Sequence, residues 1–265
     1  MKDFLGITET YSLHGPGVDH LIGIVHWFML ALFVGWTAFF LFVLWRFSKR
    51  RNPRADYTGV KNHVSTHLEI GVVIIEAVLL LGFAFPMWRE RTDKFVDVQA
   101  KDPVRVRVIG WQYAWTYHYP GEDGIFGRID RTLASYPGDP CIDPEDPSGY
   151  DDFIVAGGRL QLPEKRPAIL MITATDVIHN YAIVPMRIQQ DAIPGKDIPM
   201  WFTPRTTLET SVVCAQLCGE GHGAMRGGMD VISQASYDTW AAEQSANALK
   251  KRSSTEGRAV AKAIQ

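Results

Sequence analysis

Two thiols, an imidazole and a thioether fall within twelve consecutive residues late in the chain. The segment 214–225 reads CAQLCGEGHGAM and carries Cys214, Cys218, His222 and Met225. These are soft or borderline ligands, and soft sulfur ligands favour copper in its lower oxidation state. A single blue-copper site needs one cysteine, two histidines and a weak methionine ligand. Because this segment has a second cysteine, it permits two metal ions bridged by both sulfurs.

The second imidazole of such a site has to come from elsewhere in the chain. Of the eight histidines, five lie in the N-terminal tail or in and beside the apolar runs described below. Besides His222, only His118 and His179 remain. His179 follows a β-rich run, residues 169–174, so we expect it at the end of a strand, where a ligand can be presented to a loop. His118 is out of phase with the aromatic residues before it, which favours an ordinary strand histidine.

Three other interpretations of the segment remain open. A structural zinc site would use Cys214, Cys218 and His222, and the cysteine spacing suits zinc, although zinc does not usually recruit a thioether. A disulfide between the two cysteines is compatible with an oxidising compartment. Met225 is alternatively a residue of the hydrophobic core. Under the copper interpretation Cys141 has no partner, and because no C-x-x-C-H motif is present we expect a free or partly buried thiol rather than a heme attachment.

Two apolar runs indicate how this site is anchored. Residues 21–45 contain no Asp, Glu, Lys or Arg, and the run is long enough to cross a hydrocarbon core as a helix. Trp27 and Trp45 lie near its ends, as interfacial anchors do. A second run, residues 70–88, has Glu76 as its only charge, and Pro86 is expected to mark the exit from the helix.

The linker between the two runs is basic. Asp56 is its one acid, against six basic residues: Arg46, Lys49, Arg50, Arg51, Arg54 and Lys61. The positive-inside rule places this loop in the cytoplasm and both termini on the other side. The first 18 residues show no cleavable signal peptide. The expected organisation is an extracytoplasmic tail (1–18), a transmembrane hairpin (19–92), a soluble domain (93–232) and a C-terminal helical or disordered tail (233–265).

Period-2 patterns predict short strands in the soluble domain. Residues 104–109 read VRVRVI, and the alternation continues through the aromatic residues 111–119. Further β-rich runs are separated by Pro-Gly turn signals, which predicts a sandwich or barrel. The acidic, Pro/Gly-rich segment 121–158 is interpreted as an inserted surface loop. Residues 237–250 are expected to form a helix, followed by a frayed or disordered end.

The sulfur-rich segment resembles the dinuclear copper (CuA) signature of cytochrome c oxidase subunit II, C-x-E-x-C-G-x-x-H-x-x-M. Three further segments resemble motifs of that family in the same order: GWQYAWTY at 110–117 is similar to G-H-Q-W-Y-W-S-Y, DVIH at 176–179 to D-V-x-H, and DAIPG at 191–195 to D-A-I-P-G. The resemblance covers roughly residues 21–232. Several ordered motifs together are far more specific than any one of them.

The resemblance implies a two-helix transmembrane hairpin followed by an all-β cupredoxin-like Greek-key barrel. In the family, the copper centre passes electrons one at a time from a cytochrome c-type donor to a heme of subunit I, where oxygen reduction is coupled to proton pumping. The implied ligands are the thiolates of Cys214 and Cys218 bridging two coppers, one imidazole each from His179 and His222, a weak thioether from Met225 and the backbone carbonyl of Gln216.

The chain departs from the family pattern at two positions. Gln216 stands where many members have a glutamate whose carboxylate also binds magnesium, so that the resemblance supports a magnesium ion only weakly here. Tyr113 stands where the family has a tryptophan proposed to accept electrons. Trp111 and Trp115 flank Tyr113 and are expected on the same strand face. One hypothesis is that these aromatics accept electrons, and the other is that all three simply pack the barrel surface.

Two carboxylates accompany the second apolar run. Glu69 resembles the family's glutamate at the entrance of a proton path into subunit I, and its alternative interpretation is an ordinary interfacial carboxylate. Glu76 is seven residues further on and is expected on the same helix face. An intramembrane carboxylate is costly, so Glu76 either has a function or pairs with a polar group of subunit I.

The implied partners are subunit I with its hemes and its own copper (CuB), other oxidase subunits, a cytochrome c or membrane-bound c-type cytochrome, and membrane lipid. The implied location is the bacterial cytoplasmic membrane, in which the chain is multi-pass. The copper subunit of a nitric oxide reductase and a membrane-tethered metal-binding module remain alternatives. A net charge of -2 gives no indication of a nucleic-acid partner.

Overall fold

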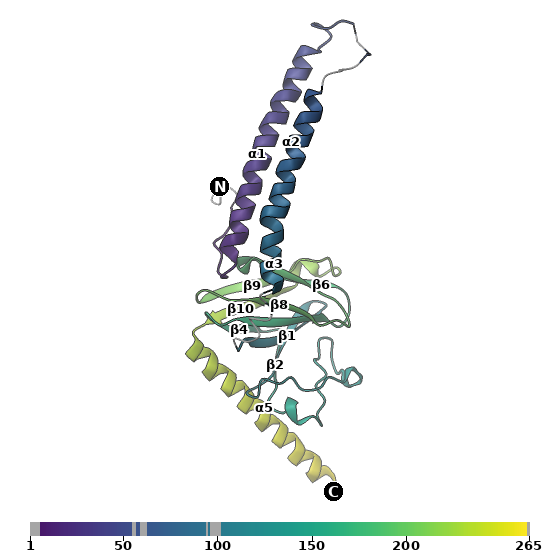
Figure 1. Ribbon diagram of the computed structural model, residues 1–265. Coiled ribbons are helices and arrows are strands. Elements are labelled where there is room, and N and C mark those ends of the chain that lie inside the picture. Colours follow the sequence, from purple (N-terminus) through teal and green to yellow (C-terminus); the bar gives the residue numbers. More distant parts are fainter. Residues whose placement is uncertain (1–5, 55–56, 59–62, 94, 96–101, 264–265) are drawn as a thin grey trace. The chain divides into compact units, whose positions relative to one another are not determined.

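The computed structural model describes residues 6–54, 57–58, 63–93, 95 and 102–263, and it divides into two compact units (Figure 1). One unit holds the N-terminal helices up to residue 94. The other holds residues 8–15 together with everything from residue 95 onward. Asp56 and Lys61 of the basic loop, and residues 96–101 near the start of the predicted soluble domain, lie outside the described residues.

The first unit contains two long apolar helices. Helix α1 spans Gly15–Arg46, and the second helix consists of α2 (Val64–Leu79), a π-helical turn (Leu80–Ala84) and α3 (Phe85–Asp93). By length and composition, each is able to cross a membrane. Both predicted apolar runs are therefore helical, and the first helix begins before the predicted start at Leu21.

Pro86 does not end the second helix, contrary to the sequence-based expectation. The helix continues to Asp93, and the π-helical turn Leu80–Ala84 immediately precedes the segment that contains the proline. A proline inside a helix lacks an N–H donor, and its ring meets the carbonyl four residues earlier. The widened turn is the local adjustment with which the chain continues as a helix.

The second unit contains ten strands in the described residues, arranged as two five-stranded sheets. The first sheet has the order β3-β2-β1-β5-β8, and the second has the order β4-β10-β9-β6-β7. Pairs β1/β5 and β4/β10 are parallel, and the other pairs are antiparallel. The first sheet consists of β1 (Val104–Trp111), β2 (Ala114–Tyr119), β3 (Phe153–Ala156), β5 (Ala168–Ala174) and β8 (Ile198–Phe202). The second consists of β4 (Arg159–Pro163), β6 (His179–Ile183), β7 (Ile188–Ala192), β9 (Leu208–Cys214) and β10 (Arg226–Ile232).

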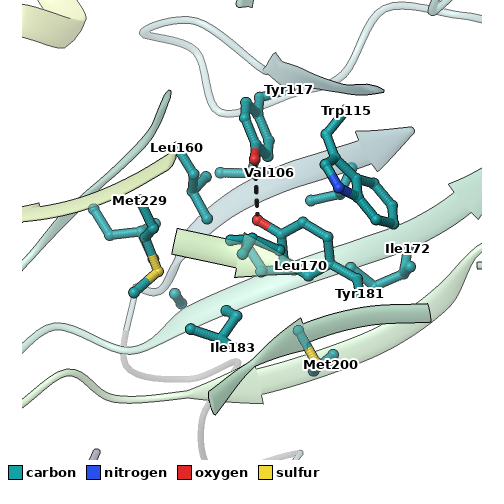
Figure 2. Packing of buried hydrophobic residues seen from close by; sticks show 14 of the residues in the cluster. Val106, Trp115, Tyr117, Leu160, Leu170, Ile172, Tyr181, Ile183, Met200 and Met229 are labelled. Carbon is teal, nitrogen blue, oxygen red and sulfur yellow. Dashed lines mark hydrogen bonds between the residues drawn. The ribbon is translucent and has the colours of Figure 1, made fainter. Parts of the chain in front are cut away.

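The hydrophobic core lies between the two sheets. Figure 2 shows Trp115 and Leu170 of the first sheet close to Leu160, Tyr181 and Met229 of the second, and all five are buried. Strands of this kind present alternate side chains to the core, which is why the period-2 pattern predicted them. The predicted all-β cupredoxin-like domain is confirmed.

The aromatic run at 110–117 does not form one strand, contrary to the sequence-based expectation. Strand β1 ends at Trp111, Gln112 and Tyr113 form the turn, and β2 begins at Ala114. In the antiparallel register Trp111 pairs with Ala114 and Gly110 with Trp115. The period-2 extrapolation was wrong because a two-residue hairpin loop reverses the chain and restarts the alternation.

Two further segments differ from the sequence-based expectation. The inserted segment is irregular to residue 152, with single 3-10 turns at Arg131–Leu133 and Pro147–Gly149, but it then forms strand β3. Helix α5 spans Gln234–Ala263 and so extends well past the predicted end at Lys250, through a stretch rich in the strong helix formers Ala, Lys and Arg. Trp240 of α5 packs edge-on against Tyr119 and Phe153 of the first sheet.

The N-terminal tail is tied to the β domain. The backbone N–H of Tyr11 donates to the carbonyl of Pro185, and that of Leu13 donates to the carbonyl of Thr203. Ser12 is fully buried. Residues 8–15 thus belong structurally to the domain that follows the helices, although they precede those helices in sequence.

Candidate metal centre

The candidate ligands lie at one end of the second sheet, at the ends of two neighbouring strands and in the loop that follows β9. His179 is the first residue of β6, and Cys214 is the last residue of β9, the neighbouring strand. Cys218 and His222 lie in the loop from β9 to β10, with His222 beginning a 3-10 turn (His222–Ala224), and Met225 comes immediately before β10. Because β6 and β9 are antiparallel, the start of one lies beside the end of the other.

The side-chain donors of this group lie close together. The two thiol sulfurs are 3.8 Å apart. The Nδ1 atom of His179 is 3.9 Å from the Cys214 sulfur, and the Nδ1 atom of His222 is 3.7 Å from the Cys218 sulfur. The Met225 sulfur is 3.7 Å from that of Cys218, and the carbonyl oxygen of Gln216 is 3.1 Å from that of Cys214. All six residues expected as ligands are therefore brought together.

The arrangement fits a metal centre better than the alternatives. A disulfide requires sulfurs about 2.05 Å apart, so Cys214 and Cys218 are free thiols. Imidazole nitrogen and thiolate sulfur bind first-row metals at about 2.0 and 2.3 Å, and two donors at such lengths lie about 3 to 4 Å apart around a shared ion. The donor atoms of His179, Cys214 and Cys218 all lie within 4.8 Å of one another, and this cluster is compatible with copper.

Four of the six residues of the cluster are shielded from water, whereas His222 is partly exposed and Gln216 is exposed. His179 is fully buried, and the exposed fractions of Cys214, Cys218 and Met225 are 8%, 5% and 1%. Burial, reinforced by the neighbouring Cys214, raises the pKa of the Cys218 thiol to about 11. A thiol in such surroundings ionises only with difficulty, so that a bound cation would be needed to hold both sulfurs as thiolates.

Asp176 fixes the orientation of the His179 ring. Its Oδ1 atom accepts a hydrogen bond from the Nε2 atom of His179 at 2.8 Å, which leaves Nδ1 facing the sulfurs. Burial of Asp176 opposes its ionisation, but hydrogen bonds from His179 and from the backbone N–H groups of Val177 and Gln112 outweigh it and lower the carboxyl pKa. A carboxylate behind a histidine ligand sets its tautomer and increases its basicity.

The three aromatic residues have different surroundings. Tyr113 is 39% exposed, and its side chain lies against the backbone of the loop from β9 to β10 (residues 215–225), called the copper loop below. A Cβ atom added at Gly219 or Gly221 would come within 2.6 Å of Tyr113. Trp115 is only 1% exposed and packs edge-on against the His179 ring at 5.9 Å. The indole N–H of Trp111 donates to the Thr116 hydroxyl, and the inserted segment covers this ring at residue 138.

Several residues singled out in the sequence lie elsewhere. Glu69 and Glu76 are on α2 in the helical unit. His118 is buried in β2 and its Nε2 donates to Asp152 at 2.7 Å, so it is a strand histidine as expected. Cys141 is buried in the inserted segment with a free thiol, also as expected.

Gln112, which no sequence motif singled out, contacts both Asp176, the partner of His179, and the loop that carries Cys218. Its side-chain Nε2 donates to the carbonyl of Cys218, and its backbone N–H donates to Asp176. The signal available in the sequence was its place beside the aromatic residues of the 110–117 motif. Gln112 reaches the copper loop because it lies in the hairpin turn between β1 and β2, which the period-2 pattern did not predict.

Comparison with known proteins supports the resemblance. A family model described as the periplasmic domain of cytochrome c oxidase subunit II matches residues 104–232. The alternative cytochrome c oxidase subunit 2 of Bradyrhizobium diazoefficiens is 28% identical over 228 residues, which cover 86% of this chain and 80% of that protein. The cytochrome c oxidase subunit 2 of Cereibacter sphaeroides is 28% identical over 244 residues, covering 85% and 77%.

A solved structure, the periplasmic domain of subunit II of the cytochrome oxidase of Bradyrhizobium japonicum, aligns with a TM-score of 0.41 and 22% identity over 54% of this chain and 94% of that one. The periplasmic-domain match and the two apolar helices indicate a membrane-anchored protein with an extracytoplasmic β domain. The β domain, residues 104–232, thus matches the periplasmic domain of the cytochrome c oxidase subunit II family, and the two relatives are similar to this chain over most of its length.

Proposed function

We propose that this chain is the electron-accepting subunit of a respiratory terminal oxidase. It receives electrons from a c-type cytochrome at a dinuclear copper centre and delivers them to a heme of subunit I, where oxygen reduction is coupled to proton pumping. The observation that carries the proposal is the convergence of six donor groups in one cluster, four of whose residues are buried. The match of the β domain to the cytochrome c oxidase subunit II family supports the assignment of the partner.

The pairing of donors favours two metal ions over one. Cys214 lies beside the imidazole of His179 and the carbonyl of Gln216, whereas Cys218 lies beside the imidazole of His222 and the thioether of Met225. Each thiolate thus has its own nitrogen donor and its own weak donor. Six donors exceed the four that a tetrahedral zinc ion takes, and the sulfurs are close enough to be shared.

A dinuclear copper centre held there supplies reversible one-electron exchange without breaking bonds. The chain provides a rigid, water-poor cage for it. His179 is held by Asp176. The copper loop closes on itself, since the backbone N–H of Cys214 donates to the carbonyl of Met225 at 3.2 Å. A cage that changes little on reduction favours rapid electron transfer.

Tyr113 is the best placed of the three aromatics to accept electrons from a donor. It is exposed to solvent and contacts the copper loop directly, whereas Trp115 is buried against His179 and Trp111 is partly covered by the inserted segment. In this proposal Tyr113 receives the electron, and the backbone at Gly219 and Gly221 carries it to the ligands.

In the helical unit, we assign Glu69 to the start of a proton path into subunit I. Its side chain lines a groove of about 350 Å³ between α1 and α2, beside Trp36 and Ser65. A carboxylate in an otherwise apolar intramembrane groove is costly unless a partner uses it. The basic loop on the cytoplasmic side, with both termini on the other side, completes the proposed topology.

The decisive experiment is to purify the complex through this chain and measure its metal content, spectrum and turnover. We expect two copper ions per chain in the extracytoplasmic domain, a near-infrared band, a mixed-valence EPR signal, and oxygen consumption with reduced cytochrome c. Cys218→Ser should abolish the mixed-valence signal. Cys141→Ser, which changes a buried cysteine outside the cluster, is the matched control and should leave it intact. One zinc ion per chain without a near-infrared band would refute the proposal.

A further inference from the structure

Gln112 is an exposed residue of the β1–β2 turn that nevertheless makes two hydrogen bonds toward the metal cluster. Its side-chain Nε2 donates to the backbone carbonyl of Cys218 at 2.5 Å. Its backbone N–H donates to the Oδ2 atom of Asp176 at 2.7 Å. The other carboxylate oxygen of Asp176 accepts from the Nε2 atom of His179 at 2.8 Å.

These bonds join segments that are far apart in the chain. Asp176 and His179 come just before and at the start of β6, whereas Cys218 lies in the loop between β9 and β10. Gln112 comes from the first sheet, and 64 and 106 residues separate it from its two partners. Gln112 is therefore a bridge from the other sheet between the two halves of the cluster.

We propose that Gln112 is a positioning residue that holds the His179 half and the Cys218 half of the metal centre at a fixed separation. Its side-chain amide fixes the backbone at Cys218, and its backbone N–H fixes the carboxylate that orients His179. The inference rests on the proposed function, because it concerns the copper centre, but it adds a residue outside the ligand set.

The effect of losing this bridge follows from where it acts. The Gln112 side chain lies at an exposed turn, so its replacement leaves no cavity in the core. What is lost is a hydrogen bond that restrains the loop carrying Cys218 and His222. Removal of groups that orient metal ligands typically weakens metal affinity about 10- to 100-fold. The two copper ions should also become less equivalent, because the lost hydrogen bond restrains the backbone of Cys218 and not that of Cys214.

The test compares Gln112→Met with the wild type and with Gln189→Met in the purified full-length complex. Gln189 is an exposed glutamine of β7 and serves as the matched control. We measure copper affinity with a competing chelator, the copper hyperfine pattern by EPR, and the thermal unfolding of metal-free protein. For Gln112→Met we expect about 10- to 100-fold weaker copper binding and an altered hyperfine pattern, with unchanged metal-free unfolding. Gln189→Met should behave as the wild type.

Two results would overturn the inference: copper affinity and EPR like those of Gln189→Met, or a loss of metal-free stability that accounts for the weaker binding. If Gln112→Met does not fold, Gln112→Glu decides in the same assays, since it keeps the side-chain length but cannot donate to the Cys218 carbonyl. Failure of this inference alone leaves a wild type with two coppers and a mixed-valence signal. Absence of that signal in the wild type would refute the proposed function itself.

Discussion

The three aromatic residues of the 110–117 motif differ in their exposure to solvent. Trp111, Tyr113 and Trp115 stand within five positions of one another, but of the three only Tyr113 is both exposed to solvent and in contact with the backbone of the copper loop. Trp115 instead packs against His179, with its ring edge-on to the imidazole. We therefore propose Tyr113 as the residue that accepts electrons from a separate protein, whereas packing explains the buried Trp115.

Tyr113→Leu should slow reduction of the copper centre by a cytochrome donor more than tenfold without changing the EPR signal. The reason is that leucine preserves part of the packing over Gly219 and Gly221 but removes the conjugated ring between donor and loop. Stopped-flow reduction by reduced cytochrome c measures this. Trp111→Leu is the comparison and should have a smaller effect. Equal rates for the wild type and Tyr113→Leu would exclude Tyr113 from the path.

At the scale of elements, a buried polar group fastens the inserted segment to the first sheet. His118 of β2 donates through Nε2 to Asp152 at 2.7 Å, and the same carboxylate oxygen accepts from the backbone N–H of Gly127 at 2.9 Å. The Phe126 ring packs edge-on against His118, and Arg107 of β1 lies over that ring. The Nη1 atom of Arg107 lies 3.4 Å from the Nδ1 atom of His118, so the neutral ring with its proton on Nε2 can accept from Arg107 and donate to Asp152 at once.

Stability of the β domain should fall as the pH drops below about 6.5. Burial lowers the pKa of His118, partly opposed by Asp152, and Arg107 lowers it further. The unfolded chain, whose histidine titrates near 6.5, then binds a proton that the folded chain does not, so acid favours unfolding by up to about 1.4 kcal/mol per pH unit. Urea unfolding between pH 7.5 and 5.5 measures this slope. His118→Gln removes the titrating group and should reduce the slope, and an unchanged slope would contradict the assignment.

At the scale of the whole molecule, the chain combines two apolar helices with a β domain that holds the cluster. Residues 8–15, which lead into α1, pack on that same domain, so the polypeptide leaves the domain, forms both helices and comes back to it. In the proposed topology, this order requires the N-terminal tail and the β domain to be on one side of the membrane. The basic loop is then on the other side.

Labelling of single introduced cysteines tests this topology. Lys49→Cys, in the basic loop, should react with a membrane-impermeant maleimide only when the cytoplasmic face is accessible. Ser236→Cys, on α5, should react only from the outside. Both positions are exposed, and the three native cysteines are buried, which keeps the background low. Reaction of both variants from the same side would contradict a two-span arrangement.

The sequence alone determined the candidate donor residues, the two long apolar helices and the strand-rich domain, because each has a signal in consecutive residues. Cys214 to Met225 lie within twelve consecutive residues, and the uncharged run 21–45 and the alternation at 104–109 are contiguous signals. The sequence pattern did not predict the turn at residues 112–113, because alternation alone does not reveal where the chain reverses between two strands. It also missed that Pro86 lies within a helix, which a π-helical turn accommodates.

Tertiary structure decided what depends on residues distant in sequence. His179 reaches Cys214 because β6 and β9 are neighbours in the second sheet, and Gln112 reaches Cys218 because the β1–β2 turn of the first sheet lies over the copper loop. No pattern of neighbouring residues in the sequence predicts either of these two contacts. The donor atoms were readable from the chain, whereas their separation and the bonds that hold them follow from how two sheets pack together.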